Sequence, residues 1–280
     1  MSTKLVVGTA QLSASYGVFP TDPRTKAGES ARIVSAIADL PLRGVDTAPS
    51  YGDAEALLAD VPHSVAVFTK LDVPASATDS IAGSLRRLGR TSVEVAFLHD
   101  AVALTDDRLL DDAHALVGTA YARLGVSTYS IREFELALAD ERIGAIQAPV
   151  SVADQRLLDA GLLAEARRRD CLVLARSVFL QGALLGQPER LPSHLRPLES
   201  LVVRLDELSR TSGRSRRDLA CAFVRDLADI GGVVIGCETE QQLRDNVALV
   251  QTDPLPVAVR DAIGDAPRLA ESVVDPTHWR

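Results

Sequence analysis

The sequence predicts an α/β protein of one domain, a closed (β/α)8 TIM barrel spanning residues 1–280. Eight short apolar runs alternate along the chain with stretches whose apolar residues recur at three- and four-residue spacing. Strands that alternate with helices form parallel βαβ units. A length of 280 residues allows two ordinary domains or one barrel, and no linker rich in Pro, Gly or Ser divides the chain. An open, doubly wound sheet would show a glycine-rich phosphate turn after its first strand, but here that turn reads Gly8-Thr9-Ala10-Gln11.

The eight apolar runs give the expected strands. Each is short, and the segments that separate them have helical spacing, which is typical of strands buried on both faces by covering helices. In chain order, the strands are expected at Leu5–Val7, Gly44–Val45, Val65–Phe68, Val95–Leu98, Leu124–Val126, Ala145–Ile146, Leu172–Leu174 and Val233–Ile235.

The segments between these strands predict helices, and one of them predicts a long loop. Helical spacing occurs over Ala31–Leu40, Ile81–Leu88, Leu109–Tyr121, Phe134–Leu138, Leu157–Ala166, Leu198–Ser209 and Arg216–Asp226. Residues 181–197 instead carry repeated Gly and Pro. Long loops in compact domains are often functional, so we expect this one to cover a substrate or cofactor.

Composition excludes several classes of function. The charge is −8, from 30 basic and 38 acidic residues without a long basic run, so nucleic acid is not an expected partner. No apolar stretch is long enough to span a membrane, and no signal-peptide pattern occurs, so we expect a cytoplasmic protein. Cys171, Cys221 and Cys237 are odd in number and widely separated, which predicts buried free thiols rather than disulfides or a metal site.

Four polar residues, Asp46, Tyr51, Lys70 and His99, stand at or just after the ends of successive apolar runs. Burying such groups beside apolar strands is costly unless they satisfy one another. In a parallel barrel, the carboxyl ends of neighbouring strands meet at one mouth, which is where such barrels carry their active sites. We therefore expect these four side chains to meet.

This set suits proton transfer to a carbonyl oxygen. A tyrosine titrates near ~10 and is a poor acid or base at neutral pH, but a neighbouring ammonium stabilises its phenolate and lowers its pKa. A carboxylate would hold the lysine charged, and a neutral histidine could orient the carbonyl while a hydride reaches its carbon. No nucleophile-elbow motif of the Gly-x-Ser-x-Gly kind competes with this interpretation.

Each of the four residues also has a purely structural interpretation. Asp46 could cap the following helix, Tyr51 could belong to a turn, and Lys70 could be an exposed strand end. His99 could form a polar pair with Asp100 in a loop. Each of these explanations is simple when taken alone, but their coincidence at successive strand ends favours the catalytic interpretation.

Over nearly its whole length, the sequence resembles the aldo-keto reductase family, and within it a short bacterial branch. The resemblance is carried by Gly44-Val45-Asp46-Thr47-Ala48 followed by Tyr51-Gly52, by Phe68-Thr69-Lys70 and by Phe97-Leu98-His99. It implies that Tyr51 is the general acid/base, Lys70 the modulator of its pKa, Asp46 the partner of that lysine and His99 the residue that orients the carbonyl.

The resemblance also implies a nicotinamide cofactor, NADPH by family habit. In this set, Ser127 and Gln147 would hold the nicotinamide carboxamide, and Arg176 occupies a position where the family often has a stacking aromatic residue. The cofactor-binding residues implied are Gly8, Thr9, Asp46, Ser127, Gln147, Arg176, Ser177, Gln181, Gly182, Gly236, Glu238, Gln242, Asp245 and Asn246.

The choice between NADPH and NADH stays open at this point. Glu238 and the neutral Gln242 stand where the family often has basic residues for the 2′-phosphate, and Glu238 would repel that group. An anion is favoured at the start of a helix that begins near these residues. The same segment also fits an ordinary capped helix, with Thr239 as N-cap and Gln242 closing a capping box.

The leading hypothesis is an NAD(P)H-dependent reductase that acts on an aldehyde, ketone or sugar. The branch is often associated with sugar-modifying enzymes, which is a hint about substrate by association only. One alternative is a regulatory or binding protein that senses nicotinamide nucleotides on the same barrel with little turnover. Another is a barrel lyase or isomerase that binds no nicotinamide. The substrate, the direction of the reaction and the oligomeric state are not fixed by the residues.

Overall fold

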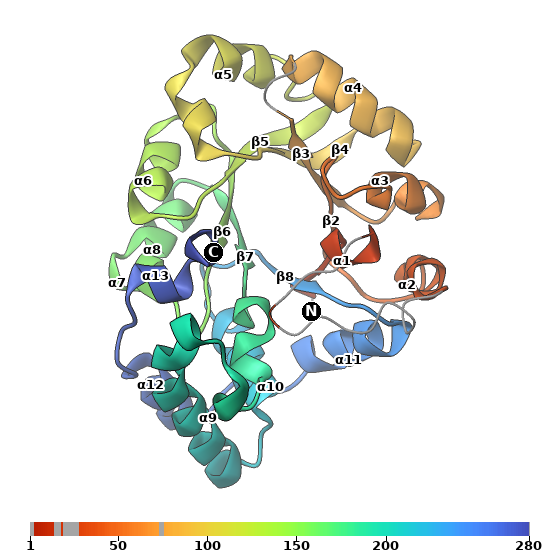
Figure 1. Cartoon of the computed structure of the whole chain (residues 1–280). Coiled ribbons are helices and arrows are strands. Elements are labelled where there is room, and N and C mark those ends of the chain that lie inside the picture. The colour runs from red at the N-terminus through yellow and green to blue at the C-terminus, as the bar shows by residue number, and fades with distance from the viewer. Residues whose placement is uncertain (1–2, 14–17, 19–27, 73–75, 280) are drawn as a thin grey trace.

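The strands form a closed parallel barrel, as the sequence predicts. The computed structural model describes residues 3–13, 18, 28–72 and 76–279. Each strand pairs with the next, and β8 pairs back with β1 (Figure 1). The strands are β1 Leu5–Gly8, β2 Gly44–Asp46, β3 Val67–Leu71, β4 Val93–Leu98, β5 Tyr121–Ser127, β6 Ala145–Pro149, β7 Leu172–Arg176 and β8 Gly232–Gly236.

A small apolar cluster fills the barrel interior, separate from the larger core between strands and helices. Phe68 and Phe97 are its largest members, and both are fully buried. Gly125 on β5 leaves room for Phe97, because a Cβ atom at that position would lie 2.5 Å from the Phe97 ring. The barrel is therefore a packed core rather than a pore, and only its rim is available for a site.

Helices surround the barrel on its outside (Figure 1). Most lie between successive strands, as expected for βαβ units. The α-helices are α1 Ala10–Ser13, α2 Glu29–Ile37, α3 Ala54–Leu57, α4 Ala77–Leu88, α5 Asp107–His114, α6 Ile131–Ala139, α7 Arg156–Asp159, α8 Leu162–Arg168, α9 Glu199–Ser212, α10 Arg216–Arg225, α11 Glu240–Val250, α12 Val257–Gly264 and α13 Glu271–Val274.

Two helix predictions were wrong in extent. The helix expected over Leu109–Tyr121 ends at His114, because the chain turns through Gly118 at φ +83° and enters β5 at Tyr121. The helix expected over Leu157–Ala166 is two short helices separated by Gly161, whose φ is +70°. Glycine adopts this left-handed conformation without steric cost, so it ends the helix although apolar spacing continues.

Residues 181–197 are compact rather than extended. They lie mainly in three 3-10 helices at Leu180–Leu185, Pro188–Arg190 and Ser193–Leu198. Leu184, Leu191 and Leu195 are buried. The segment therefore packs onto the barrel through leucines, and its first part reaches the rim.

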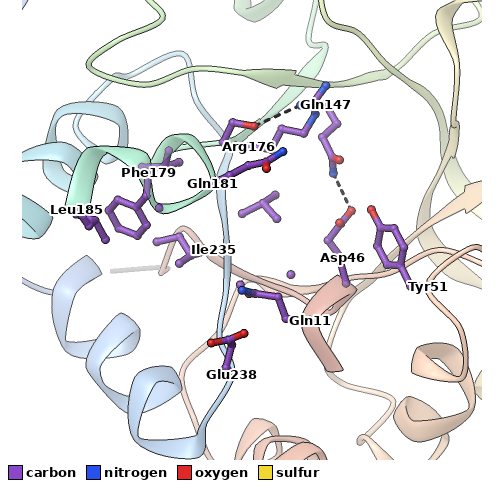
Figure 2. A pocket seen from close by; sticks show the side chains of 17 residues that line it. Gln11, Asp46, Tyr51, Gln147, Arg176, Phe179, Gln181, Leu185, Ile235 and Glu238 are labelled. Atoms are coloured by element: carbon purple, nitrogen blue, oxygen red, sulfur yellow. Dashed lines mark hydrogen bonds between the residues drawn. The ribbon is translucent and has the colours of Figure 1, made fainter. Parts of the chain in front are cut away.

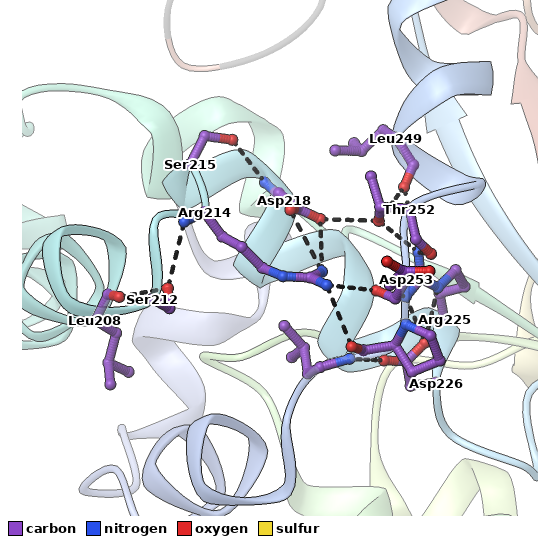
Figure 3. Close-up of polar contacts among 12 residues, drawn as sticks. Leu208, Ser212, Arg214, Ser215, Asp218, Arg225, Asp226, Leu249, Thr252 and Asp253 are labelled. Atoms are coloured by element: carbon purple, nitrogen blue, oxygen red, sulfur yellow. Dashed lines mark hydrogen bonds and ion pairs between the residues drawn. The ribbon is translucent and has the colours of Figure 1, made fainter.

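A buried arginine ties α10 to the end of α11. The Arg225 guanidinium donates to the carbonyl oxygens of Leu249, Thr252 and Asp253, and its Nε lies 2.7 Å from Asp226 Oδ1 (Figure 3). Because the side chain is only 8% exposed, these acceptors replace water for its charge. The cluster fixes the helices that flank β8.

The cysteines and the helices can be compared with the expectations about disulfides, metal sites and membrane spans. Cys171, Cys221 and Cys237 are free and buried, as predicted, and burial raises the pKa of each thiol to about 12. Within the described ranges, no cluster of three metal-binding side chains occurs. Among the helices of those ranges, none has the length and apolar character needed to cross a membrane.

Candidate active site

A buried ion pair joins the ends of β2 and β3. Lys70 Nζ lies 2.9 Å from Asp46 Oδ1 and 3.0 Å from Oδ2, and it also donates to the Thr47 carbonyl oxygen at 3.0 Å. The amide of Gln147, on β6, donates to Asp46 Oδ1 at 2.7 Å. Thr9 Oγ1 donates to the Asp46 backbone oxygen. Both charges are therefore paired and hydrogen-bonded, which makes their burial tolerable.

Tyr51 and His99 lie beside this pair, so the four predicted side chains do meet. Lys70 Nζ is 5.1 Å from the centroid of the Tyr51 ring. The His99 ring stands edge-on to Tyr51, with centroids 6.4 Å apart. Two of the structural interpretations are not met: Lys70 is 2% exposed rather than a solvated strand end, and the helix that follows Asp46, α3, has Asp53 as its N-cap. Tyr51 does lie in a turn, since its N–H donates to the Ala48 oxygen.

Burial and charge together set the protonation of these groups. Burial raises the pKa of Tyr51, and the opposing effect of Lys70 only reduces that rise. Burial also lowers the pKa of His99, and Lys70 lowers it further. For Lys70, burial acts to lower the pKa, but Asp46 and Tyr51 outweigh it, so its pKa is raised. Near neutral pH, the site therefore has a protonated phenol, a charged ammonium and a neutral imidazole.

This protonation differs in one respect from the sequence-based expectation. Lys70 does act to lower the Tyr51 pKa, but the net shift is upward because burial dominates. A protonated phenol next to an ammonium is a proton donor whose conjugate base is stabilised once the proton leaves. A neutral imidazole can donate a hydrogen bond to a carbonyl oxygen. The arrangement is thus suited to protonating an oxygen that acquires negative charge.

A cavity of about 240 Å³ opens beside Tyr51 and Asp46. Figure 2 shows Tyr51, Asp46 and Gln147 at one side, with Phe179 and Leu185 opposite them. Predicted residues that line it are Gly8, Gln147, Arg176, Ser177, Gln181, Gly182, Gly236 and Glu238. Its lining runs from Tyr51 and Asp46 to Leu185 and Glu238, so the cavity can hold a group that extends away from Tyr51.

Other predicted residues are not among those that line this cavity. Ser127 pairs in register with Gln147 and is buried, and within the described residues its Oγ has no hydrogen-bond partner. Asn246 is buried on α11, and its amide donates to the Gly236 carbonyl oxygen at 3.4 Å. Asp245 is exposed and accepts a hydrogen bond from Gln241, so it does not face the cavity.

The start of α11 is a capped helix. Thr239 Oγ1 accepts from the Gln242 backbone N–H, as predicted for the N-cap. The Gln242 side chain accepts from the backbone N–H of Glu238 rather than from that of Thr239. This contact fixes Glu238, which is 8% exposed, at the cavity wall.

Several residues that the sequence did not indicate also shape the site. Gln11 lines the cavity, and a Cβ atom on Gly236 would meet the end of its flexible side chain, which would then have to move. Arg217, on α10, places its Nη2 2.5 Å from Asn246 Oδ1 and its guanidinium 5.9 Å from the Phe179 ring centroid. Arg217 therefore brings a positive charge close to Phe179 and α11. Only the packing of α10 on α11 could have revealed this contact.

The residues present fit a nicotinamide dinucleotide. The unpartnered Ser127 hydroxyl next to Gln147 offers hydrogen-bonding groups suited to a carboxamide. Ser177, Leu180 and Gln181 have φ of 59°, 48° and 52°, a left-handed stretch that non-glycine residues adopt only at a cost. Such strain is typical of ligand-binding segments, and here it bends the backbone around the cavity.

A parallel barrel with a tyrosine beside a buried lysine–aspartate pair at its rim, next to a cavity suited to a dinucleotide, is typical of a class of oxidoreductases. The chain belongs to the aldo/keto reductase family, whose family model matches residues 4–264. It is therefore an NAD(P)H-dependent oxidoreductase, and NADPH is the cofactor of this family. No curated protein matches the sequence significantly.

Solved structures share the fold at low identity. Aldo-keto reductase AKR11C1 from Bacillus halodurans, in its holo form, is 21% identical, with a TM-score of 0.77 over 99% of this chain and 95% of that one. The glycerol dehydrogenase AKR11B4 from Gluconobacter oxydans is 21% identical, with a TM-score of 0.74 over 94% and 90%. An aldo/keto reductase from Klebsiella pneumoniae, solved with NADP and acetate, is 18% identical, with a TM-score of 0.69 over 93% and 89%.

Proposed function

We propose that this protein reduces the carbonyl group of an aldehyde, ketone or sugar, with NADPH as the hydride donor. The observation that carries the proposal is the fully paired Asp46–Lys70 ion pair directly beside Tyr51 and His99. The Klebsiella pneumoniae relative was solved with NADP, which supports this choice of cofactor. Three free buried thiols support a reducing, cytoplasmic location.

In this mechanism, each of the four side chains that meet at the barrel rim has one role. Tyr51 donates its hydroxyl proton to the carbonyl oxygen, and Lys70 stabilises the phenolate that remains. Asp46 keeps Lys70 charged and fixed, and neutral His99 orients the carbonyl oxygen by a hydrogen bond. The nicotinamide cofactor, when bound, supplies the hydride for the carbonyl carbon.

The cofactor would lie along the cavity. Ser127 and Gln147 would hold its carboxamide, and the bent segment Ser177, Gln181 and Gly182 would meet its pyrophosphate. Gly8 and Gly236 have no side chain, so the cofactor could approach their backbone closely. Thr9 would hold the end of β2 in place through its hydrogen bond to the Asp46 backbone oxygen. Glu238, Gln242 and Asn246 would form the adenosine end, where Asp245 would contribute only after leaving Gln241. The first part of residues 181–197 would cover the bound cofactor.

The substitution Tyr51→Phe tests the proposal. It removes the proton donor but keeps the ring, so we expect turnover of small aldehydes and sugars to fall by about 10²–10⁴-fold while NADPH binding is unchanged. Steady-state NADPH oxidation and a fluorescence titration with NADPH and NADH check the two parts. Tyr121→Phe is the matched control, because that hydroxyl bonds the Ala113 oxygen away from the cavity. Full turnover in Tyr51→Phe, or failure of the wild type to bind either nucleotide, would contradict the proposal.

A further inference from the structure

Arg176, at the end of β7, is a cation whose partners are all neutral. Its Nη2 donates to the Thr128 carbonyl oxygen at 3.0 Å, and its Nη1 lies 3.4 Å from Ser177 Oγ. Its guanidinium carbon is 4.0 Å from the centroid of the Tyr129 ring. Across the part of the chain that the structure describes, no carboxylate forms an ion pair with it.

The guanidinium lies between the Tyr129 ring and the cavity. Arg176 lines the cavity, whereas Tyr129 does not. Figure 2 shows Arg176 facing the same space as Gln147, Asp46 and Tyr51. Its charge contributes to the electrostatics of this corner, because it acts to lower the pKa of both Tyr51 and His99.

The charges of this corner do not cancel. Lys70 is neutralised by Asp46 at 2.9 Å. Tyr51 and His99 are uncharged near neutral pH, since burial raises the pKa of the first and lowers that of the second. Among the side chains that line the cavity next to Tyr51, the charge that remains is that of Arg176. The exposed Asp72 acts on His99 without lining the cavity, and Glu238 lies across the cavity from Arg176 (Figure 2).

The proposed reaction leaves a second positive charge in the same place once Tyr51 has regained its proton. The hydride takes two electrons and one proton from the nicotinamide ring to the carbonyl carbon, and Tyr51 supplies a proton to the oxygen. The ring, neutral before transfer, is then a cation, and Tyr51 is a phenolate. Once Tyr51 takes a proton back from water, the positive charge of the ring remains. Because the ring must stand beside a carbonyl that touches Tyr51, its charge appears in the corner that Arg176 already makes positive.

We propose that Arg176 makes the site discriminate between the two redox states of the nicotinamide, binding the reduced form and repelling the oxidised one. This inference rests on the proposed function. Like charges at short range repel strongly where water is partly excluded. Weak retention of the oxidised form would speed its release and reduce product inhibition during carbonyl reduction.

Binding titrations of the two redox forms test this inference without turnover. Dissociation constants for NADPH and NADP⁺ are measured for the wild type, Arg176→Gln, Arg176→Lys and the control Arg108→Gln, an exposed position on α5. We expect the wild type to bind NADPH more tightly. The ratio of the NADP⁺ constant to the NADPH constant should fall about tenfold in Arg176→Gln, which corresponds to ~1.4 kcal/mol. It should be retained in Arg176→Lys and in Arg108→Gln.

The outcomes separate this inference from the proposed function. A wild type that binds NADP⁺ as tightly as NADPH would overturn the inference without any variant. Equal weakening of both forms in Arg176→Gln would also overturn it, because the guanidinium would then act by stacking and not by charge. If the wild type binds neither nucleotide, the proposed function itself fails.

Discussion

The protonation of a side chain depends both on its burial and on the charges beside it, as Tyr51, Lys70 and His99 show. Burial alone disfavours the charged form of all three. Only Lys70 has a carboxylate partner at 2.9 Å, and only Lys70 keeps its charge against burial. The sequence predicted the partners correctly, but the extent of burial, which decides the net shift for Tyr51, depends on how the rim is packed.

The lowered pKa of His99 predicts a dependence of stability on pH. Its folded pKa lies below its ordinary value of 6.5, so below that pH the unfolded chain binds more protons than the folded one. Stability must therefore decrease as the pH falls through about 6.5. We expect the urea midpoint to drop between about pH 7 and pH 5, and to drop less in His99→Asn.

The control for this prediction is His63→Asn, because His63 is exposed. Its urea midpoint should follow the wild type over the same pH range. An identical pH dependence in His99→Asn and the wild type would show that His99 does not contribute.

At the scale of elements, caps and glycines decide where helices begin and end. Helix α6 begins with a full capping box: the Ser130 hydroxyl accepts from the Glu133 N–H, and the Glu133 carboxylate accepts from the N–H of Ser130. That carboxylate also accepts from the N–H of Tyr129, the residue that supports Arg176. The start of one helix is thereby connected to the cavity wall.

Ser130→Ala should destabilise the protein by about 1 kcal/mol, because one helix N–H loses its acceptor. Urea denaturation measures the change in the free energy of unfolding. Ser35→Ala, at an exposed position inside α2, is the matched control and should cause no loss. An equal effect of both substitutions would contradict a capping role for Ser130.

At the scale of the whole molecule, long-range polar contacts join elements that closure of the barrel brings together. Lys4 Nζ, just before β1, donates to the carbonyl oxygens of Arg225 and Leu227 at 2.8 Å. Arg225 in turn holds the end of α11, and Arg214 donates to the Asp253 oxygen nearby (Figure 3). These contacts connect the first strand with the helices that flank the last one.

Arg225→Leu should cost about 3–5 kcal/mol, because it removes one partner of a buried pair and leaves Asp226 without its cation and several carbonyl oxygens without a donor. Chemical denaturation by urea measures this loss. The control Arg260→Leu removes only an exposed pair at 4.0 Å and should change stability by less than about 0.5 kcal/mol. A small effect of Arg225→Leu would mean that the cluster relaxes around the substitution or admits water.

Much of the fold could be predicted because its signals are local. All eight strands lie at or within a few residues of their apolar runs, since burial on both faces requires such runs. The helices at Leu109–Tyr121 and Leu157–Ala166 were predicted too long, because apolar spacing does not reveal that Gly118 and Gly161 adopt positive φ. The spacing of apolar residues therefore determines whether a segment is a helix or a strand, whereas the residue at which a helix ends depends on the backbone conformation of single residues.

The sequence by itself determined the barrel, its order of strands and the meeting of Asp46, Tyr51, Lys70 and His99. Polar residues directly after buried strands must share one rim when those strands are parallel neighbours. Only the tertiary structure decided that Arg217 meets Asn246 and that Arg176 rests on Tyr129 beside the cavity. Such contacts join side chains on different elements through the packing of the folded chain, and no spacing along a single segment encodes them.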